Sequence, residues 1–366
     1  MKSLYAFLLI SSILINFSCD KEDYKPTTTN YLVHSNSHNE YVISTYDGKT
    51  GVTVKKAYTY PYQYQLLSSI SDVAVYNDRV YVLGGGLTVI NSTDFSTIAH
   101  YLPHFSPGNS NQLFPSRTFV NGDYMYVFGR LDNFYGGIKF KTQEEAAAAN
   151  KAYQMTNVVF REMYGTVQQG DRIFISYWNQ NPRQSHIIAF PKEINLRLSE
   201  LIIPGRTFSL LANNMNEVIA VSDSSVYIVN ASNFATKKMT SPNVITRLQD
   251  SNELTREKSA CLDPATNCLY FLQQYPDQSG PGLFKCLTKW DLNTNVQTDI
   301  YRFPSTRSNF NVTSLEFDAV LNRILLMGAE PISNANAGVI MLNTDGTEAG
   351  FFETEGRPLW LSIVKH

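Results

Sequence analysis

The feature that most constrains the fold is a unit of four short strands that recurs along the chain. The stretch "ISDVAVYNDRVYVLGGGLTVINSTDFSTIAHYLP" reads as strands over Ile70–Tyr76, Val80–Leu83, Leu87–Asn91 and Thr97–Leu102. A tight turn, a glycine hinge and a polar turn join them, as expected for an antiparallel meander. One such sheet alone would leave two apolar faces in water and would be marginally stable. The unit therefore requires neighbours of its own kind.

The same order of polar turn, aromatic-rich strand, loop, strand ending in Asn or Asp, and final strand recurs downstream. It is found around "YMYVFG", "RIFISYW", "EVIAVSDSSVYIVNASNF", "CLYFLQQ" and "RILLMG". Copies spaced by about 35 to 50 residues are typical of propeller blades. The sequence therefore predicts an all-β chain folded as a β-propeller.

The two ends of the chain complete one further unit. Residues 30–58 supply three strands without a first one, and the last ten residues, "RPLWLSIVKH", form a lone apolar strand. Pairing these ends would remove an exposed sheet edge. We predict seven four-stranded blades, closed by pairing of the N- and C-terminal strands, in a single domain over residues 31–366.

Two alternatives to seven blades remain open. Six blades would result if the third unit is incomplete, because its tail, Lys141–Asn157, breaks the strand pattern and predicts a short helix or an excursion between blades. A pair of β-sandwiches also contains regular short strands. The recurring four-strand unit and the lone terminal strand favour the propeller.

The first residues have the pattern of an export signal. One lysine precedes an apolar run over Leu4–Ile15, and a small residue, Ser18, precedes Cys19. This run is too short for a membrane-spanning helix, which needs about 20 residues. We predict a lipoprotein signal peptide over residues 1–18, followed over residues 19–30 by a lipidated Cys19 and a flexible tether. A plain signal peptide with an incidental cysteine is the alternative.

Composition excludes one class of partner and raises a question about the cysteines. The net charge is −2 and no basic field exists, so nucleic acid is not an expected partner.

In "SACLDPATNCLYF" a hairpin turning at "DPAT" would set Cys261 opposite Cys268, which predicts a cross-strand disulfide. Buried free thiols are the alternative for these two residues and for Cys286.

Catalytic and metal-binding motifs are missing from the sequence. It contains no nucleophile elbow, Walker loop or zinc-binding cysteine pair, and the "LGGG" of Leu83–Gly86 precedes a strand and so predicts a hairpin turn. His34 and His38 fall together in what reads as a solvated loop, which we favour over a metal site. We expect no enzymatic activity, no cofactor and no metal; a hydrolase or lyase using carboxylates at the channel mouth is the alternative.

The loops point to binding. In a propeller, the loops between second and third strands gather on one face with the connections between blades, and function usually lies there. Here the long loops are expected above all over Gly129–Gly137, Trp178–Ser185 and Gln273–Gly282. The loops of this face are rich in Asn, Gln, Tyr and Trp, with several Arg, a mixture that suits a bulky polar ligand. The first candidates for ligand binding are Arg130, Phe134, Tyr135, Trp178, Arg183 and Tyr275. The second candidates are Tyr62, Asn36 and Arg307.

The unit "ISDVAVYNDRVYVLGGGLTVINSTDF" resembles the blades of YVTN-type propellers. With its lipoprotein start, the chain resembles the surface-exposed propeller lipoproteins of Bacteroidota. Members of that group capture vitamin B12 or iron–siderophore complexes beside a TonB-dependent outer-membrane transporter. The resemblance implies a lipid-anchored protein on the outer-membrane surface that binds a cobamide, a siderophore or a similar ligand and delivers it to such a transporter.

The resemblance transfers no ligand-binding residue, because no loop motif of that group is present. Two other functions remain open beside ligand capture. One is a glycan-binding lipoprotein, which the aromatic and amide-rich loops also suit. The other is a scaffold whose propeller face docks a second surface protein.

Overall fold

The computed structural model describes residues 27–37, 40–60, 70, 72–84, 87–101, 113–121, 124–131, 134–141, 153–154, 162–180, 182–191, 198–248, 258–276, 283–330 and 336–366. It describes the backbone alone for residues 101, 113–116, 121, 124, 129–131, 134–141, 153–154, 162–163, 180, 274–276 and 283–285. Cys19 and Tyr62 lie outside the described residues. No helix within the described ranges is long and apolar enough to cross a bilayer.

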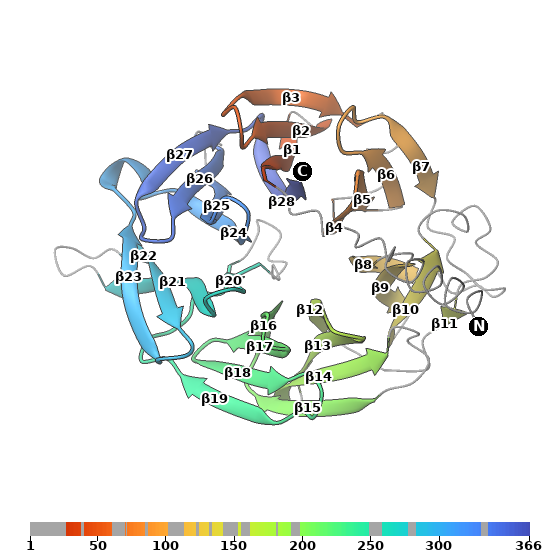
Figure 1. Ribbon diagram of the computed structural model, residues 1–366, viewed down its shortest axis with the longest axis vertical. Helices are drawn as coiled ribbons and strands as arrows, with labels where there is room; N and C mark the ends of the chain where they lie inside the picture. Colours follow the sequence, from red (N-terminus) through yellow and green to blue (C-terminus); the bar gives the residue numbers. More distant parts are fainter. Residues whose placement is uncertain are drawn as a thin grey trace, which may run out of the picture.

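Seven four-stranded antiparallel sheets surround a common centre, and the strand named first in each blade below is the innermost (Figure 1). Blade 1 contains β28 (Arg357–Lys365), β1 (Thr29–Ser37), β2 (Glu40–Asp47) and β3 (Thr53–Thr59). Blade 2 contains β4 (Asp72–Tyr76), β5 (Arg79–Leu83), β6 (Leu87–Asn91) and β7 (Thr97–Tyr101). Blade 3 contains β8 (Leu113–Asn121), β9 (Tyr124–Leu131), β10 (Phe134–Lys141) and β11 (Tyr153–Gln154).

The remaining four blades follow in chain order. Blade 4 contains β12 (Glu162–Gln169), β13 (Arg172–Gln180), β14 (Arg183–Pro191) and β15 (Ser199–Pro204). Blade 5 contains β16 (Thr207–Ala212), β17 (Glu217–Ser222), β18 (Ser225–Asn230) and β19 (Thr236–Thr240). Blade 6 contains β20 (Ala260–Asp263), β21 (Cys268–Pro276), β22 (Leu283–Asp291) and β23 (Val296–Arg302). Blade 7 contains β24 (Asn311–Asp318), β25 (Arg323–Ala329), β26 (Gly338–Asn343) and β27 (Glu348–Glu353), preceded by the 3₁₀ turn η2 (Ser305–Arg307).

The ring closes as the sequence predicts, because the C-terminal strand completes the N-terminal blade. β28 pairs with β1 from Thr29↔Lys365 to Asn36↔Arg357. The Thr27 N–H donates to the His366 carbonyl at 2.8 Å, which holds the ends of the described chain together. The prediction of seven four-stranded blades is therefore confirmed, and six blades and a sandwich pair are wrong.

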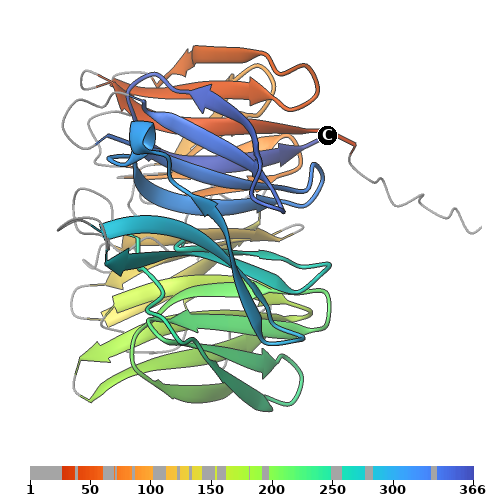
Figure 2. The same ribbon diagram turned by 90° about the vertical axis from the view of Figure 1, so that its left-hand side faces the viewer.

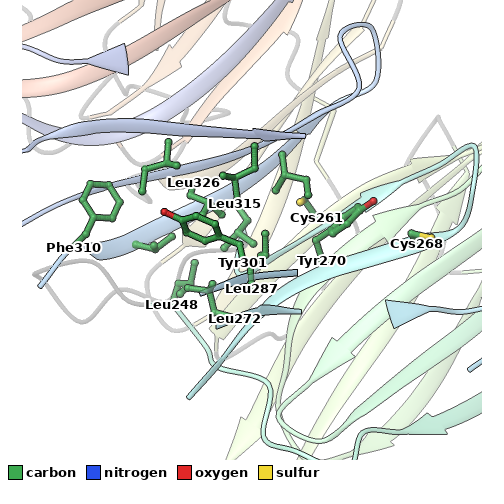
Figure 3. Close-up of a cluster of buried hydrophobic side chains, with 14 residues drawn as sticks. Leu248, Cys261, Cys268, Tyr270, Leu272, Leu287, Tyr301, Phe310, Leu315 and Leu326 are labelled. Carbon is green, nitrogen blue, oxygen red and sulfur yellow. The ribbon is translucent and has the colours of Figure 1, made fainter. Parts of the chain in front are cut away.

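Each blade is buried on both faces, which explains why the strands read as continuous apolar runs. Alternate side chains of one strand pack on opposite neighbours: Ile173 and Ile175 pack against blade 3, whereas Phe174 packs against blade 5. Among the described residues, seven clusters of buried apolar side chains fill the seven contacts between neighbouring blades. Figure 3 shows the cluster between blades 6 and 7.

The recurring Asn or Asp at the end of the third strand forms the following turn. Asn91 Oδ1 accepts the N–H groups of Thr93 at 2.8 Å and Asp94 at 3.3 Å. The next residue, Phe95, has a φ of 59° and donates its N–H to the Asn91 carbonyl at 3.1 Å. In such Asx turns the side-chain oxygen gives the N–H groups of a short loop the acceptor that they would otherwise lack. Equivalent turns begin at Asp47, Asn230 and Asp291.

The two ends of the ring differ. Connections between second and third strands and between blades lie at one end, here called the loop face, and the remaining turns lie at the other, called the turn face. The C-terminus marks the turn face in Figure 2. Five inner strands carry one extra residue in their loop-face halves, and such bulges redirect side chains. The extra residues are Leu359, Ser116, Tyr164, Phe208 and Thr313.

The structure adds to the expectations about blade 3 and the loops. Within the tail Lys141–Asn157, Tyr153–Gln154 pairs with β10 as the fourth strand of blade 3; the predicted helix or excursion falls on residues 142–152 and 155–157, which lie outside the described residues. The segments Gly129–Gly137 and Trp178–Ser185, predicted as long loops, are strand at every position that the structure describes except Pro182, which lies in a turn. Their polar and aromatic residues therefore extend hairpins at the loop face.

Candidate functional site

The structure places the predicted binding residues around the loop face, in different blades. In blade 3, Arg130 lies directly opposite Tyr135, and Phe134 begins β10. In blade 6, Tyr275 pairs with Phe284. The side chains of Arg130, Phe134, Tyr135 and Tyr275 lie outside the described part of the chain. In blade 1, the half-buried Asn36 lies near the loop-face end of β1.

Blade 4 brings two of the predicted residues to one corner of the loop face. Trp178 lies near the end of β13 and is 9% exposed, whereas Arg183 begins β14 and is exposed. The next residue, Gln184, forms a bridge with Gly205 in the connection to blade 5. The hairpin tip of blade 4 is thereby fixed to that connection.

Arg206, which the sequence did not single out, completes this corner. Its guanidinium carbon lies 4.6 Å from the centre of the Tyr164 ring and 5.9 Å from that of Trp178, and the guanidinium donates to the Tyr164 hydroxyl. Burial raises the pKa of Asp223 in the next blade, while the charges of Arg247 and Arg206 act in the opposite direction. We call Tyr164, Trp178, Arg206, Asp223 and Arg247 the Arg206 cluster.

Arg307 lies in η2, in the connection between blades 6 and 7, and its side chain contacts the perimeter of the ring. Its guanidinium donates to Glu348 Oε2 at 3.0 Å and lies 4.9 Å from the centre of the Phe351 ring. Both partners are on β27, the outermost strand of blade 7. Arg307 therefore ties the connection between blades 6 and 7 to an outer strand.

A cavity of about 370 Å³ occupies the centre of the ring. The chain enters each inner strand from the loop face, so Asp72, Lys258 and Trp360 lie toward that face and Val120, Ala212 and Phe317 toward the turn face. The volume falls within the range of small-molecule sites, and the lining combines apolar side chains with polar and charged groups. The lining comprises Asp72, Val73, Ala74, Val75, Thr118, Phe119, Val120, Thr166, Leu210, Leu211, Ala212, Lys258, Ala260, Cys261, Leu262, Leu315, Glu316, Phe317 and Trp360.

Asp72 is the most buried charged group of this lining, at 4% exposure. Its carboxylate accepts the N–H of Val73 at 2.9 Å and that of Thr118 at 2.6 Å. Burial raises its pKa to about 6, against the opposing charges of Arg117 and Lys258. Asp72 therefore joins the inner strands of blades 2 and 3 beside the cavity.

His34 does not lie in a solvated loop, contrary to the prediction. It is fully buried in β1, and its Nδ1 lies 2.9 Å from the Tyr60 hydroxyl; His38 lies outside the described residues. Another histidine, His186, places Nδ1 2.6 Å from Glu200 Oε1 under a stacked Tyr177. Within the described ranges, no group of three or more His, Cys, Asp and Glu could hold a metal ion.

The predicted disulfide does not form, because the hairpin register is offset. Cys268 pairs with Asp263 and Cys261 with Tyr270, so the two cysteines are diagonal neighbours on one face. Diagonal positions lie about 7 to 8 Å apart, beyond the usual span of a disulfide. Cys261, Cys268 and Cys286 are buried free thiols, and Figure 3 shows the first two apart in the core.

Comparison with known proteins agrees with the fold. The chain has 9% identity and a TM-score of 0.61 to a quinonprotein alcohol dehydrogenase-like protein from Bacteroides thetaiotaomicron, over 93% of this chain and 79% of that chain. A functionally unknown protein from Desulfotomaculum acetoxidans has 12% identity and a TM-score of 0.56, over 92% of this chain and 98% of that chain. Apo AztD from Citrobacter koseri has 11% identity and a TM-score of 0.52, over 93% of this chain and 98% of that chain.

At these identities the likeness to solved structures shows the fold alone. No protein-family model matches the chain, and no curated protein matches it. Fold and comparisons together define the chain as a seven-bladed β-propeller.

Proposed function

We propose that this propeller is a lipid-anchored protein of the outer-membrane surface that binds a nutrient-sized ligand on its loop face and delivers it to a TonB-dependent transporter. The observation that carries the proposal is the corner of blades 4 and 5. There Arg183 is exposed, and the bridge between Gln184 and Gly205 joins its hairpin to the backbone next to Arg206. Guanidinium groups bind carboxylate and phosphate in a fixed geometry, and aromatic rings position them. Ligands with these groups include cobamides and ferric siderophores.

Direct binding tests the proposal. Titration calorimetry of the purified protein would use cobamides, ferric siderophores, haem and oligosaccharides as separate ligands. We expect Arg183→Ala and Arg206→Ala to weaken the binding of whichever ligand is retained by at least about tenfold, which corresponds to roughly 1.4 kcal/mol. The matched control is Arg307→Ala, because that arginine pairs with Glu348 at the perimeter.

Each outcome of this titration has a distinct meaning. Binding of oligosaccharides alone would replace nutrient capture with glycan binding. No binding to any ligand, with a surface protein retained instead, would favour the scaffold. Equal losses in Arg307→Ala and Arg183→Ala would remove the assignment of the site to the corner of blades 4 and 5.

The anchor is tested separately from the ligand. We expect palmitate labelling of the protein in cells, and its loss in Cys19→Ala. Labelling that persists in this variant would contradict the lipid anchor without affecting the binding experiment.

A further inference from the structure

Lys258 lines the central cavity and makes contacts in three neighbouring blades. Its backbone lies two residues before β20 of blade 6, where its carbonyl accepts the Leu315 N–H at 2.7 Å. Its ammonium forms an ion pair with Glu316 of blade 7 and donates to the Leu361 carbonyl of blade 1 at 2.9 Å. The same ammonium lies 4.5 Å from the centre of the Trp360 ring. A carboxylate, a carbonyl and an aromatic face thus surround one cation.

These three groups are the ones that recognise an ammonium ion. A carboxylate supplies charge, a carbonyl accepts an N–H group, and an indole face attracts a cation by about 0.5 to 2 kcal/mol depending on its exposure to water. The side chains of Lys258 and Glu316 are 24% and 23% exposed, and both residues line the cavity with Trp360. A molecule in the cavity can therefore reach the place where the Lys258 ammonium lies.

The rest of the cavity suits an apolar body attached to such a cation. Its turn-face half is walled by Val75, Val120, Leu262 and Phe317, together with Leu211. Burying such a body is favourable by about 25 cal/mol per Å². The shape and chemistry match a small molecule with one amine at an end of an apolar chain or ring.

We propose that Glu316, the Trp360 ring and the Leu361 carbonyl form an ammonium-binding site, which the Lys258 side chain fills in the free protein and gives up to a small apolar primary amine that enters the cavity. The site goes beyond the function proposed above, because it lies in the channel rather than on the loop face. No covalent step is involved, since one ammonium replaces another.

The charges of the cavity favour an amine over an acid. Among its described lining residues, Asp72 and Glu316 are carboxylates and Lys258 is the one ammonium. A carboxylate ligand would have to take Lys258 from Glu316 and would leave that acid unpaired. An ammonium ligand keeps Glu316 paired and releases Lys258 into the cavity, where water solvates it.

Calorimetry with hexylammonium tests the proposal, with hexanol and hexanoate as matched probes. Lys258→Met removes the competing ammonium and keeps the length of the side chain. We expect this variant to bind hexylammonium at least about tenfold tighter than the unaltered protein, because a tethered competitor has a high effective concentration. Glu316→Gln added to Lys258→Met should abolish the preference, and hexanol should bind all three proteins alike.

Equal affinity of Lys258→Met for hexylammonium and hexanol would overturn the proposal, as would preferential binding of hexanoate. If Lys258→Met folds poorly, hexylammonium should raise its melting temperature and hexanol should not. Absence of that difference would likewise overturn it. The single variant Glu316→Gln supplies a further check, because it should bind hexylammonium more weakly than the unaltered protein does.

Discussion

His34 illustrates how a single buried polar side chain couples this fold to pH. It is fully buried in blade 1, where its Nδ1 lies 2.9 Å from the Tyr60 hydroxyl and its backbone position pairs with Trp360 of β28. Burial, and secondarily the charge of Lys258, lowers the pKa of His34 to about 3 from the ordinary 6.5. The histidine is therefore neutral in the folded protein and becomes charged in the unfolded chain as the pH falls below 6.5.

Replacing His34 should make the protein less sensitive to acid. A lowered folded-state pKa contributes stability that is present above pH 6.5 and is lost as the pH falls toward 3. Between pH 6.5 and 4 the loss is about 3 kcal/mol, at roughly 1.4 kcal/mol per pH unit. His34→Gln keeps a hydrogen-bonding group and does not titrate, so urea unfolding of both proteins should show their difference changing by this amount. A constant difference from pH 7 to 4 would contradict the buried neutral histidine.

At the scale of the element, the turn after the third strand is where sequence and structure agree best. Asn230 accepts the N–H groups of Ser232 at 3.0 Å and Asn233 at 3.1 Å. Aspartate makes the same turn at Asp47 and Asp291. The side-chain oxygen is the common requirement, which explains why the sequence alternates between these two residue types there.

Two substitutions of Asn230 distinguish the role of the side-chain oxygen from that of the side-chain NH₂ group. Asn230→Ala should lower the free energy of unfolding by about 1 to 2 kcal/mol, since two turn N–H groups lose their acceptor. Asn230→Asp should change it by less than about 0.5 kcal/mol, because the equivalent turns of blades 1 and 6 already use aspartate. Chemical denaturation measures both values, and a loss of equal size in the two variants would refute the role of the oxygen.

The elements also show where prediction from the sequence fails. The strands of blade 2 were predictable within two residues, because apolar runs and turn residues delimit them. The sequence predicts loops at the hairpin tips of blades 3 and 4, because amide and aromatic residues beyond the core form polar segments. The offset of Cys261 from Cys268 follows from a turn register that composition does not specify.

At the scale of the whole molecule, closure was predictable and the cavity was not. A lone apolar strand at the end of the chain and an incomplete first unit specify their own pairing. Lys258, Glu316 and Trp360 come from three blades, and none has a motif around it. They meet because Glu316 and Trp360 lie on the innermost strands of their blades and Lys258 lies two residues before the innermost strand of blade 6. The relative register of the inner strands places these three residues at the same height along the axis of the ring.

The position of the termini determines how an anchored ring would face its membrane. Thr27 and His366 are hydrogen-bonded at the turn face, and the segment from Cys19 to Thr27 can span at most about 28 Å. If Cys19 carries a lipid, as proposed, the turn face should lie toward the membrane and the loop face toward the medium. A transported ligand would then be captured on the outward face.

Fluorescence quenching measures this orientation in vesicles that contain a headgroup-labelled quencher lipid. A fluorophore at Lys49→Cys, exposed in the turn between β2 and β3, should be quenched at least about twofold more than one at Thr306→Cys, exposed in η2. Quenching falls steeply with distance from the lipid headgroups. Two fluorophores at opposite ends of the ring should therefore be quenched to different extents. Cys261, Cys268 and Cys286 are buried, and burial raises the pKa of Cys261 and Cys286. In protein whose Cys19 carries the lipid, labelling is therefore confined to the introduced cysteines. Stronger quenching at position 306 in protein that carries the lipid would show that the tether lets the ring turn over, and the loop face would then meet the membrane partner directly.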